Sequence, residues 1–153
     1  MVARSLPQSD LTSLYRALTY AGAIPFAVGT FCLASDIRSI PFLGDTVDVL
    51  AAYGLIIASF LSGAHWGLHL HQTGGWSMFL ALMSNVSAIG LWIGFLGLTP
   101  ASFLLLLSFV FFLLLGIEQR LVTDGLITQR YFRTRAAVTC AVVFLLIVSG
   151  LMV

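Results

Sequence analysis

Long apolar stretches alternate along this chain with short polar segments. Each apolar stretch is about as long as a helix that crosses a membrane, which needs ~20 mostly apolar residues. The pattern predicts five transmembrane spans, at residues 14–34, 47–71, 76–97, 101–121 and 131–151. The predicted fold is therefore all-α, a bundle of five transmembrane helices in a single domain over residues 1–153.

Polar and helix-breaking residues mark the ends of these spans. Residues 1–13 are expected to form a polar tail before the first span. Pro25, near the middle of that span, should bend it, because proline removes one backbone hydrogen bond and clashes with the preceding turn. The fourth span contains an almost continuous apolar run at 104–115, so we expect it to face lipid nearly all round.

Composition supports a membrane protein. Of the 153 residues, 59% are hydrophobic and only 8% are charged, whereas a soluble domain carries roughly 25% charged residues. The chain contains no lysine and no basic patch with interleaved aromatic residues, so nucleic acid is not expected as a partner. Cys32 and Cys140 belong to no CxxC or zinc-binding spacing and are interpreted as small packing residues.

The arginines predict the orientation, because cytoplasmic loops of membrane proteins carry an excess of positive charge. With five spans, one face of the membrane receives Arg4, Arg16, Arg120, Arg130, Arg133 and Arg135. The opposite face receives Arg38 alone. The N-terminus is therefore predicted to be cytoplasmic and the C-terminus outside.

The second span contains the most unusual polar groups of the chain. Among its apolar residues it carries serines, glycines, a tryptophan and three histidines. On a helix, Ser62, His65, Trp66 and His69 share a sector roughly 100° wide. Since hydrocarbon offers unpaired polar groups no hydrogen-bond partners, this face should meet other helices or a wet cavity.

A row of small residues lies beside that polar face. Ser59, Gly63 and Gly67 recur at intervals of four and would let another helix approach closely. Gly90 and Gly94 repeat the spacing in the third span. These glycines and serine, together with Pro25, are the predicted helix-packing residues.

The polar groups predicted inside the membrane gather in its cytoplasmic half, which suggests a pocket open to that side. The candidate pocket residues are His65, Trp66, Ser62, His69, Asn85, Glu118, Tyr131, Arg135 and Arg16. His65 and Glu118 would supply proton-responsive charge, because histidine titrates near neutral pH and burial shifts carboxylates. Asn85 and Tyr131 would orient a ligand, and Arg16 or Arg135 would hold its anionic groups.

Each of these residues also has a purely structural interpretation. His65 would then bond to Glu118, Asn85 or a serine, and Glu118 would form a salt bridge with Arg120 or Arg135. A metal or haem site would need ligands besides His65 and His69, and no cofactor is expected. No catalytic motif is present, so an enzyme is not predicted.

Several stretches resemble the domain-of-unknown-function 3429 family, which includes transmembrane protein 69-like proteins of mitochondria and many bacterial inner-membrane proteins. The matching residues are 23–26, Tyr53-Gly54 with 59–67 (SFLSGAHWG), Glu118 with Arg120, and Tyr131 with Arg135 and Thr139. The resemblance covers about residues 14–150. It implies a small multi-pass protein of the bacterial inner (cytoplasmic) membrane and no established reaction.

The leading functional hypothesis is binding or passage of a small solute, ion or lipid-like molecule through the predicted pocket. A structural or assembly protein, whose small-residue ridges dock partner subunits, is the alternative. A haem-, quinone- or metal-binding membrane protein is the third. The expected partners are the lipid bilayer and either a homo-oligomer or a membrane partner subunit.

Overall fold

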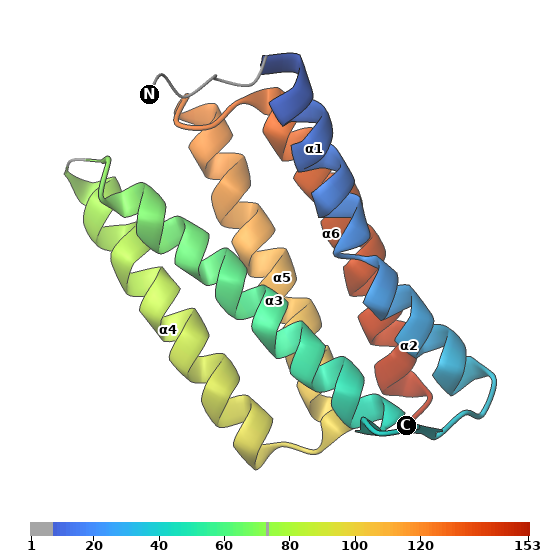
Figure 1. The fold of residues 1–153 in the computed structure, drawn as a ribbon. Coiled ribbons are helices and arrows are strands. Elements are labelled where there is room, and N and C mark those ends of the chain that lie inside the picture. The colour runs from blue at the N-terminus through green and yellow to red at the C-terminus, as the bar shows by residue number, and fades with distance from the viewer. Residues whose placement is uncertain (1–7, 73) are drawn as a thin grey trace, which may run out of the picture.

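The computed structural model describes residues 8–72 and 74–153, and helices make up most of this part of the chain (Figure 1). The helices are α1 (Gln8–Ala21), α2 (Ile24–Ala34), α3 (Thr46–His69), α4 (Gly75–Gly97), α5 (Pro100–Thr123) and α6 (Gln129–Leu151). Two short strands, β1 (Ser39–Ile40) and β2 (Gly44–Asp45), pair antiparallel between α2 and α3.

Five stretches of helix in the described residues are long and apolar enough to cross a membrane: Ser13–Ala34, which combines parts of α1 and α2, and then α3, α4, α5 and α6. The predicted bundle of five transmembrane helices is confirmed, and the chain is a multi-pass membrane protein. Residues 1–7 of the predicted polar tail lie outside the described residues. Helix α1 begins at Gln8, so it already includes the last residues of the predicted tail.

The first span is broken rather than bent. Helix α1 ends at Ala21 and α2 begins at Ile24, with Pro25 in the first turn of α2. Proline has no backbone N–H, but the N–H groups in the first turn of a helix have no partner within the helix. Proline is therefore tolerated at this position. The carbonyl of Gly22, inside the break, accepts a hydrogen bond of 3.0 Å from the Tyr53 hydroxyl of α3. The break is therefore also a contact between the first two spans.

Threonine caps set the starts of the last two helices. The Thr99 hydroxyl accepts a hydrogen bond from the backbone N–H of Ser102 (3.3 Å), and Pro100 follows as the first helical residue of α5. The Thr128 hydroxyl accepts one from the N–H of Tyr131 (3.4 Å) at the start of α6. Each cap satisfies one of the N–H groups that a helix start leaves unpaired.

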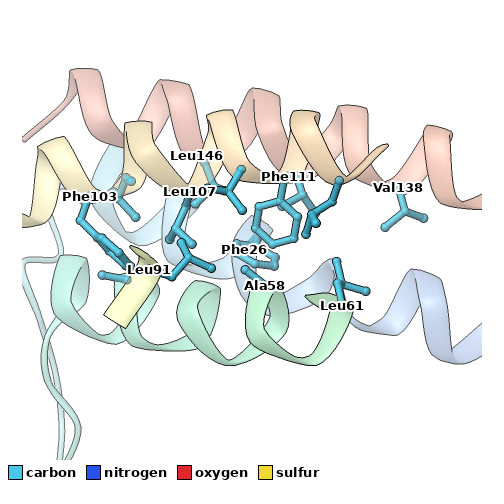
Figure 2. Close-up of a cluster of buried hydrophobic side chains, with 14 of the residues drawn as sticks. Phe26, Ala58, Leu61, Leu91, Phe103, Leu107, Phe111, Val138 and Leu146 are labelled. Carbon is cyan, nitrogen blue, oxygen red and sulfur yellow. The ribbon is translucent and has the colours of Figure 1, made fainter. Parts of the chain in front are cut away.

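Helix α5 is the centre of the bundle. It packs against α3, α4 and α6, and half of the residues in its most apolar stretch are buried. Figure 2 shows its side chains Phe103, Leu107 and Phe111 meeting Phe26, Leu91 and Leu146 of the surrounding helices. The expectation that this span faces lipid nearly all round is wrong. Lipid tails are as apolar as leucine, so an apolar run does not reveal which side faces other helices.

Two glycines let α5 come close to its neighbours. A Cβ built on Gly54 of α3 would lie 2.5 Å from Cδ1 of Leu107, and one on Gly94 of α4 would lie 2.5 Å from Cδ2 of Leu106. By contrast, a Cβ on Gly63, Gly67 or Gly90 would meet nothing within 4 Å. The predicted ridge of α3 therefore touches no other helix of the described chain at those glycines.

We expect Gly54→Leu to lower the free energy of unfolding by about 1–3 kcal/mol, because the added side chain must displace the fully buried Leu107. Gly116→Leu on α5 is the control, since a Cβ at Gly116 meets nothing within 4 Å. Unfolding by SDS titration, followed by circular dichroism, measures both. Equal losses in the two variants would contradict the close α3–α5 packing.

Candidate functional site

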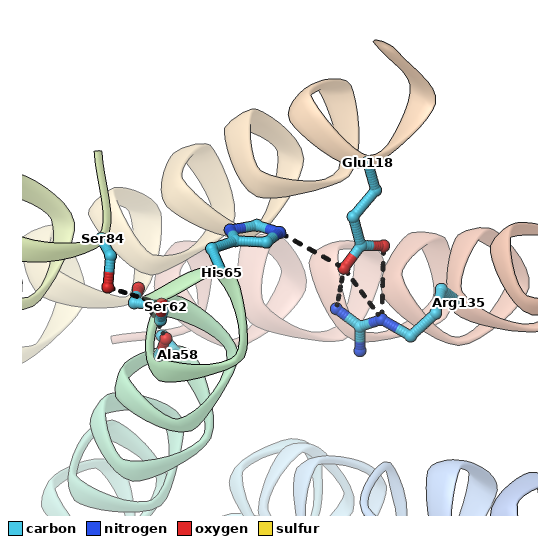
Figure 3. Close-up of polar contacts among 6 residues, drawn as sticks. All are labelled: Ala58, Ser62, His65, Ser84, Glu118 and Arg135. Carbon is cyan, nitrogen blue, oxygen red and sulfur yellow. Dashed lines mark hydrogen bonds and ion pairs between the residues drawn. The ribbon is translucent and has the colours of Figure 1, made fainter. Parts of the chain in front are cut away.

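Three charged or polar side chains from three helices meet inside the bundle (Figure 3). Glu118 comes from α5, Arg135 from α6 and His65 from α3, and their exposed fractions are only 4%, 8% and 4%. Arg135 donates from Nε to both carboxylate oxygens of Glu118 (3.3 Å each) and from Nη2 to Oε1 (3.2 Å). Nε2 of His65 lies 3.7 Å from the same Oε1. We call these three residues the buried ionic cluster.

Each member of the cluster lies on the buried face of its helix. On α6, Arg135 continues the buried face formed by Val138, Thr139 and Val142. On α5, Glu118 extends the face of Leu114, Ile117 and Leu121, and on α3, His65 extends that of Ala58, Leu61 and Ser62. Within hydrocarbon, two opposite charges are tolerable only when paired, and the guanidinium fork matches a carboxylate well.

His65 is the unsatisfied member of the cluster. Neither of its ring nitrogens has a hydrogen-bond partner among the described residues, and 3.7 Å from Nε2 to Glu118 is too long for a hydrogen bond. Leaving a buried polar group unpaired costs about 1–3 kcal/mol. A protonated ring, however, would be attracted to the neighbouring carboxylate. The structure thus places an unpaired imidazole next to a carboxylate inside the bundle.

A cavity of about 300 Å³ lies next to the cluster, between α1–α2, α3, α5 and α6. Most of its lining is apolar: Leu18, Gly22, Phe26, Ile57, Phe60, Leu61, Ala64, Phe111, Val138 and Val142. Its polar lining consists of Tyr15, Thr19, Tyr131, Arg135 and Thr139. Such a cavity, apolar with a few convergent polar groups, has the general character of a small-molecule site.

Arg135 is shared between the cavity and the cluster, because it lines the cavity and also pairs with Glu118. Next to it, the rings of Tyr15 and Tyr131 stack with their centroids 5.3 Å apart. The hydroxyl of Tyr15 is buried and has no hydrogen-bond partner among the described residues. One end of the cavity therefore offers a guanidinium and phenol groups to a ligand.

The structure brings together part of the predicted pocket and separates the rest. Tyr131 and Arg135 line the cavity, whereas His65 and Glu118 lie behind Arg135 and do not line it. Asn85 does not join the site: its side chain is exposed and donates to the carbonyl of Ala81 on its own helix (2.8 Å). Because α4 carries polar residues on neighbouring faces, at Ser84 and Asn85, its sequence did not reveal which of them turns inward.

The neighbour of Asn85 makes the contact instead. The Ser84 hydroxyl donates to the backbone carbonyl of Ser62 (2.6 Å), and the Ser62 hydroxyl donates to the carbonyl of Ala58 (3.0 Å) (Figure 3). Ser62 is fully buried and does not line the cavity. It therefore joins α3 to α4, and the ligand role predicted for it has no support in the geometry.

The other predicted pocket residues lie outside the cavity. Trp66 is exposed, and its carbonyl is paired with Nδ1 of His69, whose ring centroid lies 4.4 Å from that of the Trp66 indole. Arg16 lines a separate, exposed hollow with Arg130 and Arg133. No group of three or more His, Cys, Asp or Glu side chains in the described residues could hold a metal ion.

Sequence reasoning missed the α1 side of the cavity. Tyr15 and Thr19 line it, as does Phe26 just beyond the break. Helix α1 did carry a signal, since Tyr15, Leu18, Thr19 and Gly22 recur at spacings of three and four and so share one face of the first span. The prediction considered only charged groups on that span and so selected Arg16, which lines the separate hollow instead of this cavity.

The sequence model of the family described as "Protein of unknown function (DUF3429)" matches residues 12–151. The chain belongs to this family. The match covers nearly the whole chain and includes every residue of the cavity and the buried ionic cluster, so the resemblance seen in the sequence is confirmed. No match was found among curated proteins or among solved structures. The DUF3429 description assigns no activity.

We expect Glu118→Gln to lower the free energy of unfolding by about 3–5 kcal/mol, because it leaves the Arg135 guanidinium buried without its counter-charge. SDS or thermal unfolding in detergent measures the loss. Arg120→Gln on the same helix is the matched control, since Arg120 is exposed and should change stability by no more than about 0.5 kcal/mol.

The double variant Glu118→Gln/Arg135→Gln extends this experiment. Its loss of unfolding free energy should be smaller than the sum of the losses in the two single variants. The reason is that the double variant removes both charges and leaves none unpaired. Strictly additive losses would mean that the two side chains do not depend on each other.

Proposed function

We propose that this chain binds a small amphiphilic, lipid-like molecule in the cavity between α1–α2, α3, α5 and α6. The observation that carries this proposal is the distribution of chemistry in the lining, with apolar side chains along most of the cavity and Arg135, Tyr15 and Tyr131 at one end. An apolar tail would replace lipid contacts along the cavity. The polar group of the ligand would meet the guanidinium and the phenols.

The position of the cavity suits a ligand that reaches it through the membrane. All of its lining residues lie within the stretches long and apolar enough to span a membrane. For a molecule that already partitions into the bilayer, moving its tail from lipid to the apolar cavity would change the free energy little. Its affinity would therefore come from shape and from the polar end, where Arg135 supplies charge-assisted hydrogen bonds.

We further propose that the polar end of the cavity lies on the cytoplasmic side of a bacterial inner membrane. The α1 start, the α5 end and the α6 start lie at the same end of the bundle (Figure 1). Arg16, Arg120, Arg130 and Arg133 belong to these helix ends, whereas Arg38 belongs to the connector at the other end. This bias supports a cytoplasmic N-terminus and an external C-terminus.

A docking function is the second candidate, and a separate observation favours it. At Gly63 and Gly67 of α3, a Cβ would have no atom of another described element within 4 Å. Small residues left uncovered in this way would let a helix of another subunit approach closely. In that case, Gly63→Leu would abolish a subunit complex seen on gentle detergent extraction, and ligand binding in the cavity would be unchanged.

The cavity proposal predicts that protein extracted gently from its own membranes carries one amphiphilic molecule per chain, visible as a mass increment in native mass spectrometry. Val142→Phe, which places a ring in the cavity, should lower the occupied fraction at least about tenfold. Ala141→Phe is the matched control, because Ala141 is exposed and does not line the cavity.

Should Val142→Phe fail to fold, Ala64→Phe tests the same cavity from α3. A mass spectrum with no specific molecule, or one whose bound molecule survives in both cavity variants, would contradict the proposal.

A further inference from the structure

The charge balance of the site restricts which ligand it can take. Arg135 is the only charged side chain in the cavity lining as described, and no acid lines it. Yet the positive charge of Arg135 is already matched by Glu118, which lies behind it. A second anion in the cavity would therefore bring one uncompensated negative charge among mostly apolar side chains, which is costly.

His65 is placed to supply the missing positive charge. Its Nε2 lies 3.7 Å from Glu118 Oε1, and neither ring nitrogen has a hydrogen-bond partner among the described residues. A proton on Nε2 and a small approach of the two side chains would create a charge-assisted hydrogen bond, typically about 2.7–2.9 Å long. Glu118 would then keep a counter-charge even if Arg135 turned toward the cavity.

Among the described groups that face the cluster, only His65 can take up a proton next to Glu118. Arg135 and Tyr131 face Glu118 from α6, and Tyr15 faces it from α1. Helix α4 carries no titratable side chain, and Cys32, the only one on α2, lies toward the opposite end of the bundle. His69, one turn along α3, is paired with the Trp66 carbonyl.

We propose that the cavity takes an anionic amphiphile and that each binding event takes up one proton on His65. Before binding, Arg135 and Glu118 balance each other and His65 is neutral. After binding, Arg135 balances the anionic group of the ligand and the imidazolium of His65 balances Glu118. One negative charge and one proton enter together, so the buried site remains neutral. This inference rests on the proposed function of the cavity and adds the charge of its ligand.

The geometry of Arg135 allows this exchange. It uses Nε and Nη2 on Glu118, while its remaining nitrogen, Nη1, makes no hydrogen bond to the described residues. Because Arg135 also lines the cavity, an anion bound there would lie beside the same side chain. The phenols of Tyr15 and Tyr131, stacked beside it, can donate to the same anionic group.

The test uses decane-1-sulfonate, whose charge does not change near neutral pH, and decan-1-ol as its neutral counterpart. Calorimetric titration of the full chain in nanodiscs, against empty nanodiscs, is run in two buffers with different ionisation enthalpies. Wild-type protein should bind the sulfonate at least about tenfold more tightly than the alcohol. It should take up close to one proton per sulfonate, so above neutral pH its affinity should fall about tenfold for each added pH unit.

His65→Gln should remove the proton uptake and flatten this pH dependence, since glutamine is similar in size and cannot be charged. His69→Gln is the matched control on the same helix and should behave as the wild type, because His69 does not face Glu118. If His65→Gln fails to fold, ¹⁵N chemical shifts of the wild-type His65 ring provide the same test. The ring should be neutral without the sulfonate and protonated with it.

The outcomes separate this inference from the function on which it rests. Equal affinity for the sulfonate and the alcohol, or sulfonate binding with unchanged proton uptake in His65→Gln, would overturn the inference and leave amphiphile binding in place. No saturable binding of either probe would remove the proposed function, and the inference with it.

Discussion

The Glu118–Arg135 pair imposes the strictest constraint on this structure. Hydrocarbon cannot solvate either charge, so the two side chains must stay together. The pair fixes the register of α5 against α6 near one end of the bundle. Toward the other end, the hydroxyl of Thr30 on α2 lies 2.9 Å from that of Ser149. Helix α6 is thus held by a polar contact toward each end of the bundle, and it contributes residues 131–142 to the cavity.

Small residues complement this polar constraint by setting how closely the helices approach. Gly54 and Gly94 let α3 and α4 come close to the large side chains of α5, which makes α5 the central helix even though its sequence is the most apolar. In a membrane, the packing of such complementary shapes drives association, because lipid is no less apolar than the helix interface. A Cβ at Gly63 or Gly67, on another side of α3, would meet no other helix of the described residues.

The guanidinium of Arg135 contributes both to the stability of the bundle and to the lining of the cavity. Arg135 neutralises Glu118 and also lines the cavity, so a ligand that attracts Arg135 disturbs the pair that holds α5 to α6. His65 stands beside that pair with both ring nitrogens unpaired. A fold selected only for stability would gain from an apolar residue at this position. The arrangement is understandable if the protonation of His65 matters to what the cavity binds.

The amino-acid sequence alone was enough for the fold class, the number of spans, a distortion of the first span near Pro25 and the family. Each depends on local properties, namely runs of apolar residues, proline chemistry and short motifs. It also singled out His65, Glu118 and Arg135, because ionisable residues in apolar stretches are conspicuous. Only the tertiary structure decided that Arg135 rather than Arg120 pairs with Glu118, that Ser84 rather than Asn85 joins α4 to α3, and that Tyr15 and Thr19 line the cavity. The physical reason is that hydrophobic periodicity separates core from surface only where water is the alternative. In lipid both sides of a helix are apolar, and the rotation of each helix is set by contacts between residues far apart in the chain.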